Sequence, residues 1–121
     1  MRVLVVEDYD DNRFLLKYML EREGCQVLEA VDGQNALRLA LEEHPDLVLM
    51  DIGLPDIDGL EVTRRLKALP ATSAIPVIAI SAFCAESLKK REALESGCTA
   101  CLKKPLLWAE LAQLLGWTET P

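Results

Sequence analysis

Short apolar runs alternate with amphipathic segments along the whole chain, and this alternation limits the possible folds more than any other feature. Five runs rich in Val, Leu and Ile have the length of buried strands, and each is followed by apolar residues at helical spacing. The second run is the most polar, which places it near a sheet edge. Five strand–helix units predict an α/β protein with a parallel sheet, helices on both faces and right-handed crossovers. The predicted strands are residues 2–7, 26–30, 46–51, 75–80 and 99–102.

The predicted helices are bounded by residues that commonly begin or end helices. The Asp-Asp-Asn sequence at residues 10–12 offers N-cap side chains for the first helix, and Gly24 stops it. The second helix ends before Pro45 and the third ends at Pro70. A weakly amphipathic helix over residues 86–96 precedes the last strand. These boundaries support five separate helices between and after the strands.

The chain has 121 residues, which suits one domain around one apolar core. We expect a domain over residues 1–118 and a tail over residues 119–121. The formal net charge of −7 argues against direct nucleic-acid binding and against adhesion to an anionic membrane. No apolar run approaches the roughly 20 residues that span a bilayer, and the first residues lack the apolar region of a signal peptide. We therefore expect a cytoplasmic protein.

The four cysteines are Cys25, Cys84, Cys98 and Cys101. In a cytoplasmic protein we expect them to be reduced and partly buried. Cys98 and Cys101 form a C-x-x-C sequence, but no second cysteine or histidine pair completes a zinc site. The residues between them also do not begin a helix, as they would in a thioredoxin-like motif. A structural role is the favoured interpretation for all four.

Chemically active residues stand where the predicted strands end. The first strand ends at Glu7 and Asp8, the third at Asp51 and the fourth at Ser81, and Lys104 follows the fifth. Functional sites of doubly wound sheets lie at the carboxyl ends of the strands. Three carboxylates, a hydroxyl and an ammonium group are therefore predicted at one rim. A carboxylate that closes an apolar strand, as Asp51 does, is costly to bury unless it is paired or functional.

This set of groups predicts metal-assisted phosphoryl transfer. Carboxylates so close together repel one another, and one would take up a proton unless a cation were bound. Mg²⁺ suits a site with few carboxylates, waters and a phosphate. Lys104 supplies a fixed positive charge, and the Ser81 hydroxyl can donate to an added oxygen. Together they would stabilise the charge on a phosphoryl group in transfer.

Each site residue also has a purely structural interpretation. The Glu7-Asp8 pair can serve as acids at the N-terminus of the first helix. Ser81 can be a turn former and Lys104 a surface lysine. The basic run at residues 89–91 is interpreted as a solvated helix face. These interpretations are weighed against the structure below.

The motifs at the strand ends resemble the signature of response regulator receiver domains, the phosphorylation switches of two-component signalling. Pro55 and Gly59 follow Asp51 by four and eight residues, and the motifs occur in order over essentially the whole chain. The resemblance implies a flavodoxin-like three-layer sandwich with five parallel strands in the order 2-1-3-4-5. The residues that carry it are Glu7-Asp8, Asp51, Pro55, Gly59, Ser81-Ala82 and Lys104-Pro105.

The same resemblance implies a metal-binding set. Asp8 and Asp51 would bind Mg²⁺ through their carboxylates, and Gly53 would bind it through its backbone carbonyl. Glu7 would act through a bound water. Mn²⁺ is expected to substitute for Mg²⁺.

The resemblance also implies the phosphoryl chemistry. Asp51 would accept a phosphoryl group from a histidine of a sensor kinase or a histidine phosphotransfer protein. Ser81 would hydrogen-bond the phosphoryl group and carry the conformational change, and Lys104 would bind another phosphoryl oxygen. The Lys104-Pro105 peptide is expected to be cis. A downstream protein would bind the face made by the fourth helix, the fifth strand and the fifth helix.

Cys101 departs from the pattern of the family. Receiver domains often have Tyr or Phe on the fifth strand, three residues before the lysine, where the ring moves inward with the hydroxyl residue. That position is Cys101 here. The conformational change can pass instead through the loop after Ser81 and the fourth helix. Alternatively, the smaller side chain packs inward in both states.

Three other functions are compatible with parts of this pattern. A small phosphohydrolase with an aspartyl nucleophile commonly has a second acid two residues later, where this chain has Gly53. A flavodoxin-like electron carrier needs a Gly/Ser/Thr-rich phosphate loop, which the acidic residues 7–11 would oppose. A receiver that takes no phosphoryl group and acts as a constitutive docking module is the third. We expect no enzyme activity beyond Mg²⁺-assisted self-phosphorylation and autodephosphorylation. If the chain is complete, we expect it to bind a partner protein rather than DNA.

Overall fold

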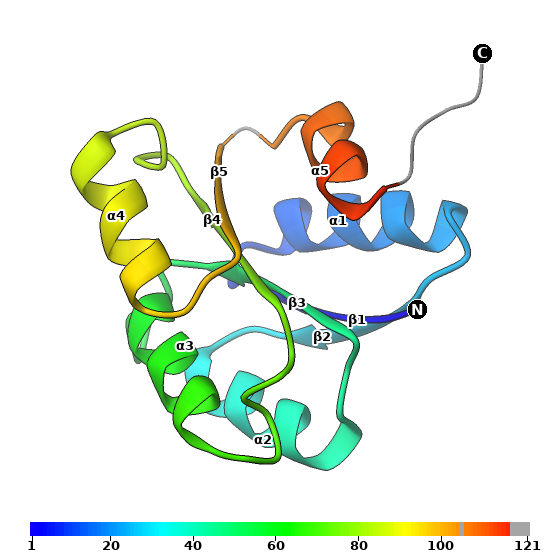
Figure 1. Cartoon of the computed structure of the whole chain (residues 1–121). Helices are drawn as coiled ribbons and strands as arrows, with labels where there is room; N and C mark the ends of the chain where they lie inside the picture. Colours follow the sequence, from blue (N-terminus) through cyan, green and yellow to red (C-terminus); the bar gives the residue numbers. More distant parts are fainter. Residues whose placement is uncertain (105, 117–121) are drawn as a thin grey trace.

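The computed structural model describes residues 1–104 and 106–116, in which five strands alternate with five helices (Figure 1). In chain order the elements are β1 (Arg2–Val6), α1 (Asp10–Arg22), β2 (Gln26–Ala30), α2 (Gly33–Glu43), β3 (Leu47–Asp51), α3 (Gly59–Ala68), β4 (Val77–Ser81), α4 (Ser87–Glu95), β5 (Ala100–Lys103) and α5 (Trp108–Leu115). The alternation predicted from the sequence is confirmed, and the strand boundaries differ from the prediction by at most two residues.

The strands form one parallel sheet in the order β2-β1-β3-β4-β5, as the resemblance implied. Strand β2 lies on one side of β1, and β3, β4 and β5 follow in that order on the other side. Val5 pairs with Glu29 on one side and with Leu49 on the other. The strand order therefore reverses beside β1, and a parallel sheet has its binding crevice at such a point.

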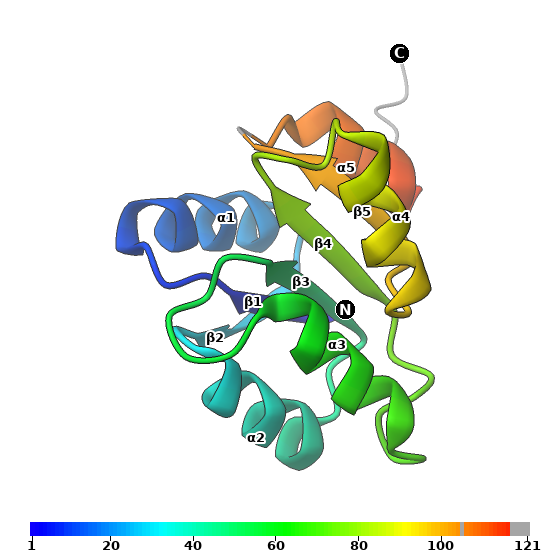
Figure 2. The same ribbon diagram turned by 90° about the vertical axis from the view of Figure 1, so that its left-hand side faces the viewer.

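Helices cover both faces of the sheet and make a three-layer sandwich. Helices α1 and α5 lie on one face, and α2, α3 and α4 lie on the other (Figure 1). Figure 2 shows the sheet between these two groups. Alternate residues of β1 and β3 point to opposite faces, so each strand contributes to both apolar cores. Leu4 and Val48 pack toward α2 and α3, whereas Val5 and Leu49 pack toward α1.

The positions of the strands explain their composition. All five residues of β3 are buried, because β3 is central and both its faces are covered. In β2, only Ala30 is buried. The predicted edge position of the more polar second strand is confirmed, since β2 is the edge strand next to β1.

The helix ends differ in part from the sequence prediction. Helix α1 has Tyr9 as its N-cap without a side-chain cap bond, so the predicted capping by residues 10–12 is wrong. Asp10 and Asp11 instead lie in the first turn, where negative charge favours the helix dipole. Gly24 follows the helix with a φ of +85°, as its predicted role as a helix stop requires.

Aspartate side chains cap helices α2 and α3. The Asp32 carboxylate accepts a hydrogen bond of 2.8 Å from the backbone N–H of Asn35 at the start of α2. The Asp58 carboxylate accepts one of 2.7 Å from the N–H of Leu60 at the start of α3. Each bond satisfies a backbone donor that has no partner inside its helix.

Within residues 1–104 and 106–116, no helix combines the length and apolar character needed to cross a membrane. The predicted domain boundary at residues 118 and 119, the predicted tail and the predicted cis peptide at Pro105 lie outside the described residues.

Candidate functional site

The carboxyl ends of β1, β3, β4 and β5 surround a cleft of about 440 Å³. Every residue assigned to the site from the sequence lines this cleft, so the structure brings them together at one rim. They are Glu7, Asp8, Asp51, Gly53, Ser81 and Lys104.

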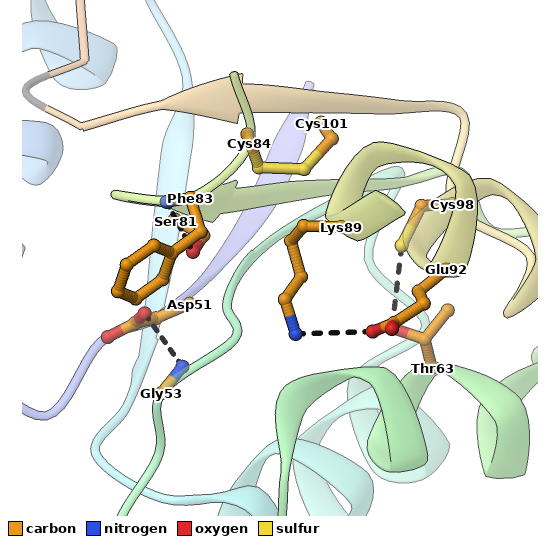
Figure 3. Close-up of a disulfide and its surroundings, with 10 residues drawn as sticks. All are labelled: Asp51, Gly53, Thr63, Ser81, Phe83, Cys84, Lys89, Glu92, Cys98 and Cys101. Atoms are coloured by element: carbon orange, nitrogen blue, oxygen red, sulfur yellow. Dashed lines mark hydrogen bonds and ion pairs between the residues drawn. A yellow bond between two sulfur atoms is a disulfide. The ribbon is translucent and has the colours of Figure 1, made fainter. Parts of the chain in front are cut away.

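Asp51 closes β3 and is held on both of its carboxylate oxygens. It is only 6% exposed. Oδ1 accepts a hydrogen bond of 3.1 Å from the backbone N–H of Gly53, and Oδ2 lies 3.2 Å from the Lys104 ammonium group. Figure 3 shows the Asp51 side chain directed to the Gly53 backbone in the loop after β3. The carboxylate is thus fixed in orientation and paired, as a buried charge must be.

Lys104 follows β5 and contacts residues at the ends of β1, β3 and β4. Its Nζ donates to Glu7 Oε1 at 3.1 Å and also contacts Asp51, and its backbone N–H donates to the Ser81 carbonyl oxygen at 3.0 Å. Burial alone would lower the pKa of this lysine. The hydrogen bond that Lys104 donates to Glu7 and the charges of both carboxylates outweigh burial and raise the pKa above its ordinary value. Lys104 therefore stays protonated between the two acids.

Glu7 is the most strongly perturbed acid of the site. Its side chain is buried, and burial, together with a hydrogen bond and the charge of Asp51, raises its pKa from 4.5 to about 7. Lys104 opposes this rise but does not cancel it. The Lys104 ammonium group alone therefore does not balance the negative charge of the carboxylates at this rim.

The acids at this rim have the geometry of a cation site. One carboxylate oxygen from each of Glu7, Asp8 and Asp51 can be chosen so that all lie within 4.8 Å of one another. Asp8 is exposed and the other two are buried, so the cluster opens to solvent on one side. Oxygen donors and an unbalanced negative charge match a hard divalent cation, and the residues present therefore fit the metal that the sequence predicts.

The structural interpretation of Glu7 and Asp8 as helix acids is wrong. Neither residue caps α1, whose N-cap is Tyr9. The side chain of Glu7 instead contacts Lys104, and Asp8 lines the cleft. Both residues lie between β1 and α1, where the chain leaves the sheet.

Ser81 ends β4 and is buried beside this cluster. Its Oγ accepts a hydrogen bond of 3.1 Å from the backbone N–H of Phe83 (Figure 3). This bond uses an oxygen lone pair and leaves the hydroxyl proton available for an acceptor in the cleft. Ser81 is thus a turn residue whose hydroxyl can also donate to a ligand.

Two site features were missed by the sequence analysis. Lys89 lines the cleft from the first turn of α4, is half-buried and pairs with Glu92 at 3.2 Å, so its interpretation as a solvated residue is wrong. Lys90 and Arg91 are exposed, as predicted. The start of α4 follows β4 closely, and this position could have suggested that Lys89 reaches the same rim.

Arg13 is the second feature. It is a buried arginine of α1 that donates to the Glu7 carbonyl oxygen at 3.1 Å and pairs with Asp10 and Glu29. It fixes the backbone at the end of β1, which positions the side chains of Glu7 and Asp8. Nothing in the sequence distinguishes Arg13 from a surface arginine, because its partner Glu29 lies on β2, 16 residues further along the chain.

The prediction that all four cysteines are reduced is wrong for two of them. Cys84, in the loop after β4, and Cys101, in β5, form a disulfide with their Cα atoms 5.5 Å apart. The register of the sheet explains the pairing, since Cys101 pairs with Ala79 and the chain turns after Ser81 so that Cys84 lies over β5. Cys25 and Cys98 are free and buried, as expected. The expectation of reduced cysteines rested on a cytoplasmic location, which carries no information on whether two residues 17 positions apart meet in the fold.

The raised pKa of Glu7 predicts how the stability of the metal-free protein depends on pH. The unfolded chain releases this proton near pH 4.5, but the folded protein keeps it up to about pH 7. The folded state therefore binds more protons between these values, and the Glu7 contribution to the free energy of unfolding falls as the pH rises, by about 3 kcal/mol. Chemical denaturation in EDTA measures it.

Glu7→Gln should remove this part of the pH dependence, because the amide does not titrate. The exposed Glu95 of α4 provides the matched control, and Glu95→Gln should follow the wild type. Identical slopes for wild type and Glu7→Gln between pH 4.5 and 7 would show that Glu7 is already ionised in the folded protein.

Comparison with known proteins gives concordant matches. The sequence model of the response regulator receiver domain matches residues 3–116. The polar-differentiation response regulator DivK of Brucella ovis is 42% identical over 104 residues, which make up 86% of this chain and 84% of DivK.

Two solved structures extend the similarity to three dimensions. The receiver domain of the Pseudomonas aeruginosa sensor histidine kinase PA1611, with a magnesium ion coordinated in its active site cleft, is 33% identical with a TM-score of 0.86, covering 96% of this chain and 94% of that one. The Saccharomyces cerevisiae Ssk1 receiver domain, crystallised with the histidine phosphotransfer protein Ypd1, is 27% identical with a TM-score of 0.85, covering 94% and 85%.

Proposed function

Because this chain belongs to the response regulator receiver domain family, we propose that its phosphoryl acceptor is Asp51 and that a phosphohistidine is the donor. Phosphorylation on an aspartate is the function of this family in two-component signalling. The observation that carries the assignment is the position of Asp51. It is the buried carboxylate at the switch point of the sheet, with Gly53 on one oxygen and Lys104 on the other.

The transfer step follows from these contacts. An Asp51 oxygen attacks the phosphorus, the phosphorus–nitrogen bond of the phosphohistidine breaks, and the imidazole leaves with the bonding electron pair and takes up a proton. Lys104 moves from the carboxylates to a phosphoryl oxygen, and the Ser81 hydroxyl donates to another. The task of these residues is to position and neutralise charge, which is most of what phosphoryl transfer requires.

Asp8 and Asp51 would hold Mg²⁺ through carboxylate oxygens, Gly53 through its carbonyl and Glu7 through a water. When bound, the ion supplies the positive charge that the three carboxylates and the added phosphoryl oxygens need. The acidic cluster and its unbalanced charge support this set. Mn²⁺ would substitute, since the same oxygen ligands suit it.

Receiver domains are signalling modules rather than enzymes. We propose that the only chemistry of this chain is its own phosphorylation, from a phosphohistidine or a small acyl phosphate, and its own dephosphorylation. In the second reaction water attacks the phosphorus, the Asp51 oxygen–phosphorus bond breaks, and inorganic phosphate leaves.

The upstream partner would be a sensor histidine kinase or a histidine phosphotransfer protein, in the cytoplasm. The similarity to the Ssk1 receiver, which binds the phosphotransfer protein Ypd1, supports this class of partner. The net charge of −7 supports a protein partner rather than nucleic acid or an anionic membrane.

The downstream partner would bind the face formed by α4, β5 and α5. This face has exposed leucines together with basic residues, which suits a partner with apolar and acidic groups. The residues are Leu88, Lys90, Arg91, Leu94 and Leu107.

Incubation with acetyl phosphate tests the proposed function. With Mg²⁺ we expect the intact mass to increase by one phosphoryl group, and with EDTA we expect no increase. Borohydride reduces an aspartyl phosphate to homoserine, and peptide mapping should then find homoserine at position 51. An unchanged mass would favour a receiver that docks without phosphorylation. Homoserine at another position would overturn the assignment of Asp51, and sustained phosphate release from monoesters would favour a phosphohydrolase.

A further inference from the structure

The disulfide between Cys84 and Cys101 closes a ring of chain that contains all of α4. Figure 3 shows it on the α4 side of the sheet, bridging the end of the β4 region and β5. Both cysteines are buried. The bond therefore lies inside the fold, and one of its cysteines belongs to β5, a strand of the face proposed to bind the downstream partner.

Cys84 is the anchor of the loop that follows β4. In residues 82–86, Cys84 is the one buried side chain, and its four neighbours are exposed. Helix α4 is also weakly held, since Ala93 is its one buried residue. The loop after β4 and helix α4 thus bury few side chains, and the disulfide is a covalent link between this segment and β5.

The ring begins and ends close to two residues of the site. Cys84 lies three residues after Ser81, and Cys101 lies three residues before Lys104. The Ser81 carbonyl oxygen accepts hydrogen bonds from the backbone N–H groups of both Cys84, at 3.3 Å, and Lys104, at 3.0 Å. A movement of the Ser81 backbone toward a ligand in the cleft would therefore also move the backbone to which the disulfide is attached.

We propose that Cys84 and Cys101 are a reversible thiol–disulfide site that controls the response of this domain to phosphorylation. In the disulfide form, the loop after β4 is held to β5 and α4 does not rearrange when Asp51 is modified. In the dithiol form, the loop is released and α4 responds. The inference rests on the proposed function, because it concerns how phosphorylation of Asp51 reaches α4.

The reaction partner is a dithiol in one direction and a small disulfide in the other. A thiolate of the external dithiol attacks one sulfur of the pair, the protein disulfide breaks and a mixed disulfide forms. The second external thiolate then displaces the remaining protein sulfur. Two electrons and two protons pass to Cys84 and Cys101, and the external dithiol becomes a disulfide. Because both cysteines are buried, exchange requires opening of the exposed loop around Cys84.

The two free cysteines do not compete for this pairing. Cys98 points away from the disulfide and contacts the Thr63 hydroxyl at 3.9 Å, and burial raises the pKa of its thiol (Figure 3). Cys25 belongs to the core on the opposite face of the sheet. Cys25→Ala is therefore a matched control that leaves the proposed pair intact.

Hydrogen exchange with mass spectrometry tests the proposal on the full chain. Intact mass separates the two forms, which differ by two hydrogens. Without a ligand, we expect amides of residues 82–96 to exchange at least about tenfold faster after reduction, equal to about 1.4 kcal/mol of local opening free energy. With Mg²⁺ and beryllofluoride, exchange in this segment should change in the reduced protein and in the Cys84→Ser/Cys101→Ser variant, but not in the disulfide form.

Equal exchange in the two forms, or the same response to beryllofluoride in both, would overturn the proposal. Cys25→Ala should retain the effect of the reductant, and its loss in this variant would also count against the pair. Failure of the proposed function would look different. Neither form would then take a phosphoryl group from acetyl phosphate, while the exchange rates without ligand would still decide whether the disulfide restrains the segment.

Discussion

Asp51→Asn is expected to take up no phosphoryl group from acetyl phosphate or from a phosphohistidine. The amide has nearly the same shape as the carboxylate, and its oxygen can still accept the hydrogen bond from Gly53. It lacks the charged oxygen that attacks phosphorus, and it withdraws one charge from the site. We therefore expect labelling to fall below detection while the fold is retained. Intact mass and circular dichroism measure the two properties.

Asp58→Asn is the matched control for this loss. Asp58 lines the same cleft and caps α3 through the N–H of Leu60, and asparagine can provide the same cap. This variant should be labelled like the wild type. Continued labelling of Asp51→Asn, or a complete loss in Asp58→Asn, would place the acceptor elsewhere.

Gly59→Ala is expected to destabilise the folded protein on the order of 3 kcal/mol or more, because a side chain here meets backbone that cannot move aside. A Cβ atom on Gly59 would overlap the carbonyl oxygen of Asp51 and lie 2.8 Å from the Cα atom of Ile52. The N–H of Gly59 also donates to the Ile52 carbonyl at 2.9 Å, which holds the start of α3 against the end of β3. Chemical denaturation measures the loss.

Gly53→Ala provides the comparison for this effect. The nearest atom to a Cβ on Gly53 is Oδ1 of Asp51 at 3.9 Å, which is an ordinary van der Waals contact. We expect this variant to remain within about 1 kcal/mol of the wild type. If Gly59→Ala were equally mild, the close approach of α3 to the acceptor strand would not be a constraint on this fold.

Much of the fold follows from the pattern of apolar residues. A strand such as β3, buried on both faces, needs a run of apolar residues, and a helix that covers the sheet needs a stripe at helical spacing. The placement of Glu7, Asp51 and Lys104 was predictable for a related reason. Each directly follows or closes a strand, and parallel strands all end at the same rim.

Contacts between segments far apart in the sequence were not predictable in this way. The Cys84–Cys101 disulfide depends on the register of β5 against β4 and on the turn after Ser81. The burial of Arg13 depends on Glu29 of a neighbouring strand. Polar and cysteine side chains carry no periodicity that would reveal these contacts, whereas apolar residues do.

A crystal structure of the protein with Mg²⁺ and beryllofluoride, a mimic of the phosphoryl group, tests most directly whether the metal ion and the phosphoryl group bind at one site around Asp51. We expect beryllium bonded to an Asp51 oxygen, the metal ion held by Asp8 and Asp51, and Lys104 and Ser81 in contact with fluorine atoms. Metal and beryllofluoride bound away from Asp51, or a cleft in which Lys104 still bridges Glu7 and Asp51 with neither ligand present, would contradict the proposed site.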